Sequence, residues 1–204
     1  WAPEHLSLYS LIVEPGTPYE RAVRRGKLRP ADDDLSADMY ERAMERLAVA
    51  GWDHYEVSNW ARDPARVSRH NRIYWENGQY LGLGAGAHAH IGKVRASNVR
   101  PIAAYLEQTA QGQLPVAFSE TLDEATAMGE TMMLGLRLIH DGVAAAAFRA
   151  RHGVALDVAY GDVLPALSRD GLVDWDGERV CLTPRGLLLA DTVAEQFIVA
   201  TVSG

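Results

Sequence analysis

Residues 6–13, with the sequence LSLYSLIV, constrain the fold more than any other segment. Apolar and small polar residues alternate at the start of this segment, and it ends in the apolar run 11–13, which is followed by Pro15 and Gly16. A run of this kind with β-branched residues, closed by Pro-Gly, predicts a strand that is buried on both faces, as in parallel sheets. Such a strand needs neighbours on both sides. The 204 residues contain too few other strands of this type to close a barrel, so we expect the rest of the sheet to lie outside this chain.

Composition narrows the classes of function. The chain is 48% hydrophobic and carries a formal charge of -7 without any Lys/Arg-rich block, so it can bury a core but offers no charge pattern suited to nucleic acid. Cys181 is the single cysteine, which excludes an internal disulfide and favours a reducing, cytoplasmic setting. We find no apolar run long enough to span a bilayer, and the first residues lack the basic start and the small-residue cleavage site expected of a signal peptide.

Residues 32–51 predict a helix, because apolar residues recur every four positions, acids begin the segment and Gly51 follows it. The next segment, 54–58, alternates, which predicts a strand with His54, Glu56 and Ser58 on one polar face. This face either meets solvent or lines a polar cavity. If the second interpretation holds, the three side chains point into the mouth of a barrel.

The last third of the chain predicts a different architecture. A methionine-rich helix extends from residue 123 toward Gly142, after a connector at 115–122, and two further helices follow at 143–151 and 157–169. Strands at 172–175 and 179–182 flank an Asp-Gly turn, and Thr183-Pro184 then starts a final helix. This order is typical of a winged helix. Residues 143–204 hold 5 bases and 8 acids, so we expect a packing or protein-contact module rather than a DNA-binding one.

The segment SRHNRIYW, residues 68–75, holds the first candidate site. If it is helical, His70 lies over Tyr74 and Asn71 lies beside Trp75, four residues apart in each case. An imidazole and a phenol on one face, with an indole nearby, could give haem or another flat conjugated molecule an axial ligand and a stacking surface. Alternatively, His70 and Asn71 make turn hydrogen bonds while the aromatic rings pack.

The segment YLGLGAGAHAHIG, residues 80–92, holds the second candidate. Glycines at every other position predict a strand with one bare face, against which another backbone or a flat ligand can lie. Its spacing does not match a dinucleotide-binding fingerprint. His88 and His90 would share a face, but no third ligand lies close in the sequence, so we predict no metal site here.

Six segments together resemble one known family. In order, HLSLYSLIVEPGTPYERAVRRGKL, HYEVSNWA, SRHNRIYW, YLGLGAGAH and LGLRLIHDGV with LTPRGLLLADTVAEQF are similar to the C-terminal half of the radical SAM coproporphyrinogen III oxidase-like proteins, the HemN/HemW family. The motif H-N-x-x-Y-W, met by His70, Asn71, Tyr74 and Trp75, resembles the HemW branch, whose members are haem chaperones. The resemblance therefore implies a haem site at these four residues.

The resemblance also implies cofactors. Family members bind a [4Fe-4S] cluster through a C-x-x-x-C-x-x-C loop and use S-adenosylmethionine; this loop is absent here, since Cys181 stands alone. We therefore expect a portion of the family protein that is inactive without the cluster-binding half. By approximate correspondence with the family, Ile12, Glu56 and His88 lie near S-adenosylmethionine.

The predicted fold class is α/β: the C-terminal part of a partial TIM-like barrel at 1–118, followed by a helical, winged-helix-like domain at 119–204. The implied function is haem binding and delivery to acceptor proteins, including membrane-associated ones, and the family allows a homodimer. An oxygen-independent coproporphyrinogen III oxidase is the alternative enzyme, and a bare interaction module is a third alternative. Whichever holds, we expect the apolar strand at 6–13 to be covered, because exposed strands of this kind invite pairing with another chain.

Overall fold

The computed structural model describes residues 1–202, with side chains to residue 198, and divides them into two compact units. The first unit comprises residues 1–67 and the second begins at Ser68. The domain boundary expected between residues 118 and 119 falls inside strand β6 (Val116–Thr121) of the second unit. The compact units and the expected domains therefore do not share a boundary.

The first unit contains a small antiparallel sheet with strand order β1-β3-β2. Its strands are β1 (His5–Ser7), β2 (Asp53–Glu56) and β3 (Asn59–Ala61). Two helices, α1 (Pro18–Arg24) and α2 (Asp33–Val49), lie between β1 and β2 in the sequence, and the short helix η1 (Pro64–Arg66) follows β3. The predicted helix at 32–51 is confirmed, with the Asp32 side chain accepting a hydrogen bond from the Leu35 N–H, 2.9 Å, as its N-cap.

The long buried strand expected at 6–13 is wrong for this chain. Only β1 forms, antiparallel to β3, and the chain beyond Ser7 has no regular structure up to Thr17. Leu11 and Ile12 are 73% and 71% exposed. The described residues provide no second strand beside 8–13, so the backbone there cannot complete a ladder and its apolar side chains stay in solvent.

The alternation expected at 54–58 is also broken. A register shift between His54 and Glu56 interrupts the pairing of β2 with β3, so Tyr55 and Glu56 are both buried. His54 is half-buried and lies flat against Trp60, with ring centroids 4.0 Å apart. The face is therefore not a simple polar surface in solvent.

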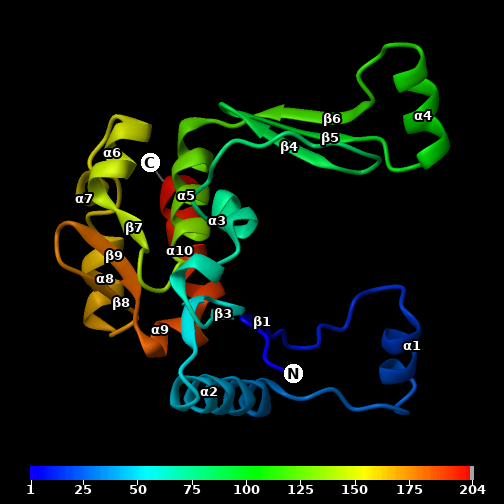
Figure 1. Cartoon of the computed structure of the whole chain (residues 1–204). Helices are drawn as coiled ribbons and strands as arrows, with labels where there is room; N and C mark the ends of the chain where they lie inside the picture. Colours follow the sequence, from blue (N-terminus) through cyan, green and yellow to red (C-terminus); the bar gives the residue numbers. More distant parts are fainter. Residues whose placement is uncertain (203–204) are drawn as a thin grey trace. The chain divides into compact units, whose positions relative to one another are not determined.

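The second unit begins with helix α3 (Arg69–Trp75) and continues into an antiparallel sheet of order β4-β5-β6. Its first two strands are β4 (His88–Ile91) and β5 (Val94–Asn98), and helix α4 (Ile102–Ala110) connects β5 to β6. In Figure 1 these strands extend from the helices and α4 lies beyond their ends. The connector expected at 115–122 is therefore a strand, because its backbone completes the ladder of β5.

The glycine-rich segment does not form the predicted strand. Tyr80 makes one isolated bridge with His90, and residues 81–87 are irregular. Gly84 and Gly86 adopt left-handed backbone conformations, with φ of 108° and 71°, which turn the chain rather than extend it. At Gly82 an added Cβ would lie 2.3 Å from the His88 carbonyl oxygen, so close backbone approach does explain that glycine.

The helical part of the second unit packs around a third sheet, of order β7-β9-β8. Helix α5 (Glu124–Gly135) lies against α10 (Ala190–Val202), as Figure 1 shows. The remaining elements are β7 (Val143–Ala144), α6 (Ala145–His152), α7 (Leu156–Ala159), α8 (Val163–Arg169), β8 (Val173–Trp175), β9 (Arg179–Leu182) and α9 (Pro184–Leu188). The predicted hairpin is confirmed, with β8 and β9 antiparallel.

Three expected helices are shorter than predicted. The helix from residue 123 ends at Gly135 rather than near Gly142, the helix at 157–169 is divided into α7 and α8 around Gly161, and the last helix is divided at Leu189. Glycine costs helix stability, which explains the second division.

Buried apolar side chains from these elements form one core. They are Met132, Leu136, Leu138, Phe148, Leu156, Tyr160, Leu164, Leu167, Val173, Val180, Val193 and Phe197. None of the helices among the described residues is long and apolar enough to cross a membrane.

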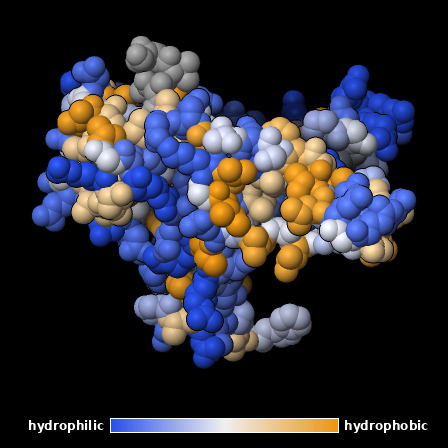
Figure 2. Space-filling view, turned by 90° about the horizontal axis from the view of Figure 1, so that it is seen from above, coloured by the Kyte–Doolittle hydropathy of each residue, from blue (hydrophilic) through white to orange (hydrophobic). Residues whose placement is uncertain are grey.

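Exposed apolar side chains concentrate in the segment 81–118 of the second unit. They are Leu81, Leu83, Ile91, Val94, Ile102, Leu106, Leu114, Val116 and Phe118. Figure 2 shows apolar side chains gathered at the molecular surface. We call this segment the apolar arm, because exposed apolar side chains gathered in this way are typical of interaction sites.

Candidate functional site

Helix α3 carries the H-N-x-x-Y-W motif and is fixed at both ends. The Ser68 hydroxyl caps its start by accepting a hydrogen bond from the Asn71 N–H, 3.3 Å. At the other end, Asn77 adopts a left-handed conformation with φ of 50°, and its side-chain amide donates to the Thr131 hydroxyl of α5, 3.0 Å. The helix is therefore attached to the core by its C-terminal end, and its four motif side chains have defined directions.

Two of the motif rings begin a row of aromatic contacts. His70, which is exposed, meets Tyr74 edge-on with ring centroids 4.9 Å apart, as the helical spacing predicts. Tyr74 meets Tyr80 at 4.6 Å, and Tyr80 meets His90 at 6.2 Å. We call these four rings the aromatic row. Burial, followed by the neighbouring Tyr74, raises the pKa of the Tyr80 phenol, which keeps it protonated at neutral pH.

The other two motif residues do not join this row. Trp75 lies under the Arg137 guanidinium, whose central carbon is 4.5 Å from the ring centroid, and its Nε1 is buried without a partner among the described residues. Asn71 is half-buried, and its backbone N–H is bound by Ser68. The structure thus brings His70 and Tyr74 together and turns Trp75 toward a different set of residues.

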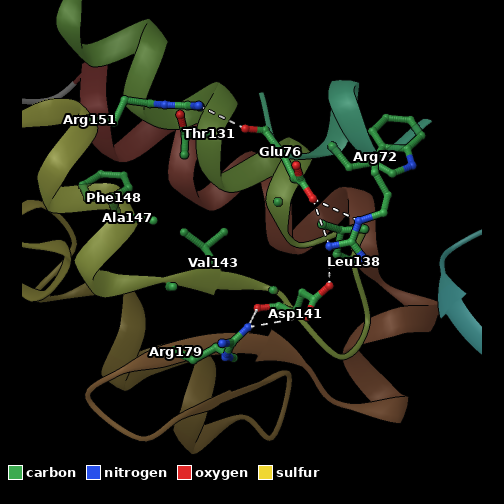
Figure 3. Close-up of a pocket in the computed structure, with 14 residues that line it drawn as sticks. Arg72, Glu76, Thr131, Leu138, Asp141, Val143, Ala147, Phe148, Arg151 and Arg179 are labelled. Carbon is green, nitrogen blue, oxygen red and sulfur yellow. Dashed lines mark hydrogen bonds and ion pairs between the residues drawn. The ribbon is translucent and has the colours of Figure 1, made fainter. Parts of the chain in front are cut away.

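Trp75 lines a cavity of about 250 Å³ between α3, α5, β7, α6 and β9. Figure 3 shows Arg72 and Arg179 reaching Asp141 at its rim. Arg72 contacts the carboxylates of Asp141 at 2.7 Å and Glu76 at 2.9 Å. Leu138, Val143 and Phe148 supply apolar walls. Both acids at this rim pair with Arg72, so we call it the ion-pair cavity. Arg151 also lines this cavity.

A second cavity, of about 290 Å³, is lined by residues of β4, the turn that follows it, α5 and α6. Its titratable lining side chains are all basic: His90, Lys93, Arg151 and His152. Burial, with a smaller contribution from the positive charge of Arg151, lowers the pKa of His152. We call this the basic cavity. His90 is also the last ring of the aromatic row, so the row connects the basic cavity to the exposed His70.

The residues expected near S-adenosylmethionine lie in both units. In the first unit Glu56 is fully buried; its Oε1 accepts hydrogen bonds from the Asn59 side chain and from the Ser58 N–H, 3.2 Å, while Oε2 has no partner among the described residues. A buried carboxylate oxygen without a donor fits a site completed by a polar ligand. Ile12 is exposed in the same unit, and His88 is exposed in the second.

Metal coordination finds no support among the described residues, where no cluster of three His, Cys, Asp or Glu side chains occurs. His88 is exposed while His90 is buried, although both belong to β4. Cys181 is half-buried on β9 and burial raises the pKa of its thiol, so it is not poised as a thiolate ligand. A lone cysteine does not fit a [4Fe-4S] cluster, which is held by several cysteines.

The residues that the sequence predicts to bind haem have a geometry that fits this ligand in part. His70 offers an exposed imidazole, and Tyr74 supports that ring edge-on. Trp75 is committed to Arg137. Sequence reasoning missed Tyr80, Arg72 and the basic side chains of α6, because the spacing within one segment says nothing about residues that reach the same place from other elements.

Comparison with known proteins identifies relatives. Residues 122–189 match the HemN C-terminal domain. The chain is 42% identical over 198 residues to heme chaperone HemW of Mycobacterium tuberculosis, covering 96% of this chain and 47% of the relative. It is 37% identical over 195 residues to heme chaperone HemW of Bacillus subtilis, covering 96% and 51%. The chain thus spans about half the length of the curated relatives it matches.

A solved structure supports the fold. Coproporphyrinogen III oxidase (HemN) from Escherichia coli, described as a radical SAM enzyme, superposes with a TM-score of 0.70. The match covers 96% of this chain and 48% of that one at 18% sequence identity. At this identity the likeness shows a shared α/β arrangement and does not carry the enzyme's activity to this chain.

Proposed function

We propose that this chain, which belongs to the HemN/HemW family, forms part of a radical SAM family protein that binds haem and passes it to acceptor proteins. The relatives named heme chaperone HemW align over most of this chain but extend to about twice its length. The activity therefore belongs to the longer protein, and the residues of this chain supply part of its haem site.

The observation that carries the proposal is the exposed His70 imidazole held edge-on against Tyr74. Histidine is a common axial ligand of haem iron, and an exposed ring fixed by a neighbour loses little further freedom on binding. The arrangement lies at the surface of α3, where a flat molecule larger than either cavity has access. The proposed haem site also includes Asn71 and Trp75, the remaining residues of the motif. Trp75 would act indirectly, by holding the helix in place through its contact with Arg137.

The alternative function is radical decarboxylation of coproporphyrinogen III. It is favoured by the fold shared with the Escherichia coli enzyme, whereas the H-N-x-x-Y-W motif and the names of the more similar relatives favour the chaperone. Full-length protein with a reconstituted cluster distinguishes the two. We expect haem to bind without formation of protoporphyrinogen. Turnover of coproporphyrinogen III would instead favour the oxidase over the chaperone.

The cofactor part of the proposal assigns Glu56, Ile12 and His88 to the neighbourhood of S-adenosylmethionine. The orphaned Oε2 of Glu56 supports this, because it could accept a hydrogen bond from a polar ligand. A cluster with bound S-adenosylmethionine supplies radical chemistry in this family. Its cysteine ligands would have to come from outside the present chain, which contains only Cys181.

The finer architecture and the partners also belong to this proposal. We infer that residues 1–118 complete a partial TIM-like barrel and that 119–204 form a winged-helix-like domain. The apolar arm supports protein partners, which we take to be haem acceptors, membrane-associated ones included, or a second copy of the chain. The single cysteine favours a cytoplasmic setting.

Haem titration of a His70→Ala variant tests the proposal. Loss of an axial ligand should shift the Soret band and weaken binding, whereas His88→Ala should leave both unchanged. His88 is a matched control because it is also an exposed histidine of the second unit. If the haem spectrum changes with His88→Ala and not with His70→Ala, the axial ligand is His88 of β4 and the assignment to His70 is wrong.

A further inference from the structure

The basic cavity differs in charge from the rest of the molecule. The chain carries a formal charge of -7, yet the cavity wall contains His90, Lys93, Arg151 and His152 and no acidic side chain. Asn77 and Gln79 add amide groups, and Leu122 and Ala127 add apolar surface. Such a wall favours an anion that carries a small apolar portion.

The residues around these basic side chains do not neutralise all of their positive charge. Arg151 donates to the Glu76 backbone carbonyl, 3.1 Å, which is neutral, as Figure 3 shows. Lys93 pairs with the Glu124 carboxylate, but both side chains are more than half exposed, so this pair is weak and can exchange. Glu130, the other nearby acid, is engaged by Arg95 at 2.7 Å. Among the described residues Arg151 thus pairs with no carboxylate, and it is the main uncompensated charge at the cavity.

The position of the cavity indicates which anion it receives. The aromatic row leads from His70 through Tyr74 and Tyr80 to His90, with successive centroid separations of 4.9, 4.6 and 6.2 Å. At about 290 Å³ the cavity is too small for a porphyrin ring but large enough for its side groups. Haem carries two carboxylates on one edge, away from the iron at its centre.

We propose that the basic cavity binds the propionate carboxylates of haem while the ring lies along the aromatic row with its iron at His70. This inference rests on the proposed function and extends it by naming the group that orients the ligand. Arg151 can hold a carboxylate through two parallel N–H donors, and Lys93 exchanges Glu124 for the second carboxylate. The site thereby distinguishes haem from flat molecules without acidic substituents.

The test compares haem with haem dimethyl ester, in which both carboxylates are blocked. The full-length protein that contains this chain and its double variant Lys93→Gln/Arg151→Gln are titrated and followed by the Soret band. We expect the unaltered chain to prefer haem over the ester about tenfold or more. The double variant should lose this preference and bind both ligands with the affinity the unaltered chain has for the ester.

The matched control is Lys27→Gln/Arg149→Gln, which removes the same two charges from exposed positions outside the cavity. It should retain the preference for haem. If the unaltered chain binds haem and ester equally, or the double variant keeps the preference, the cavity assignment is wrong while the chaperone function stands. If neither ligand binds to the folded full-length protein that contains this chain, the proposed function fails and the cavity assignment fails with it.

A second arm separates haem carboxylates from free carboxylates. Sodium propionate is titrated without haem, and the ring protons of His152 are followed by NMR. A bound carboxylate should raise the pKa of His152, and this shift should be absent in the double variant. A propionate-induced shift without discrimination between haem and ester would show a site for small carboxylates and overturn its assignment to haem.

Discussion

Replacing Tyr160 with phenylalanine should stabilise the second unit, against the usual effect of changing a core residue. Tyr160 is only 1% exposed, and its hydroxyl has no hydrogen-bond partner among the described residues. Burial raises the pKa of this phenol far above its usual value, so the group is buried neutral and still carries an unmet donor. The ring itself is well placed, edge-on to Phe197 at 5.0 Å and to Phe148 at 5.9 Å.

The magnitude follows from what the substitution removes. A buried polar group without a partner costs about 1–3 kcal/mol, and phenylalanine keeps both ring contacts. We therefore expect Tyr160→Phe to raise the free energy of unfolding by about 1–2 kcal/mol. For a unit of this size the melting temperature should rise by roughly 2–8 °C.

Urea denaturation followed by circular dichroism measures this effect as a higher midpoint at unchanged slope. The matched control is Tyr105→Phe, because the Tyr105 hydroxyl accepts a hydrogen bond from the Gly84 N–H, 3.0 Å. That variant should be neutral or destabilised. If Tyr160→Phe lowers the midpoint as Tyr105→Phe does, the Tyr160 hydroxyl has a partner and the reasoning fails.

Two further substitutions test the stability of the second unit. Burial and the positive charges of Arg151 and Lys93, opposed by the negative charge of Glu124, lower the pKa of His152 below its value of about 6.5 in the unfolded chain. The free energy of unfolding should therefore fall as the pH drops below about 6.5. His152→Gln should weaken this pH dependence, which urea titrations at several pH values measure. Gly186→Ala should cost about 1–3 kcal/mol, since its Cβ would lie 1.8 Å from the Leu172 carbonyl oxygen, whereas Ser168→Ala on the exposed face of α8 should leave the urea midpoint unchanged.

Local signals in the sequence predicted elements that depend on local interactions. Helix α2 was predictable because Asp32 caps it and an apolar residue recurs every turn, and the β8–β9 hairpin was predictable from its Asp-Gly turn. The strand at 6–13 failed because a strand requires partners, and no pattern within the segment reveals whether the chain contains them. The prediction of a strand through Gly84 and Gly86 was wrong for a related reason, because glycines at alternate positions fit both a strand with one bare face and a series of turns.

The site shows the same limit. The four-residue spacing predicted the contact of His70 with Tyr74, which lies within one helix. It could not predict that Tyr80 continues the row, or that Arg151 and His152 of α6 line the cavity at its end, because these residues arrive from other elements. Long-range contacts of this kind are fixed by tertiary packing rather than by sequence periodicity.

The H-N-x-x-Y-W motif therefore combines two physical tasks on one short helix. One face presents His70 and Tyr74 at the start of the aromatic row, where a ligand can reach them. The other face places Trp75 under Arg137 and Arg72 between two carboxylates, which fixes the orientation of the helix against α5 and the loop that follows it. A helix of only seven residues has little stability of its own, so the binding face keeps its geometry only because the opposite face is anchored. In the haem site that we propose, the four motif residues would thus supply both a ligand-facing pair and the packing that holds that pair in place.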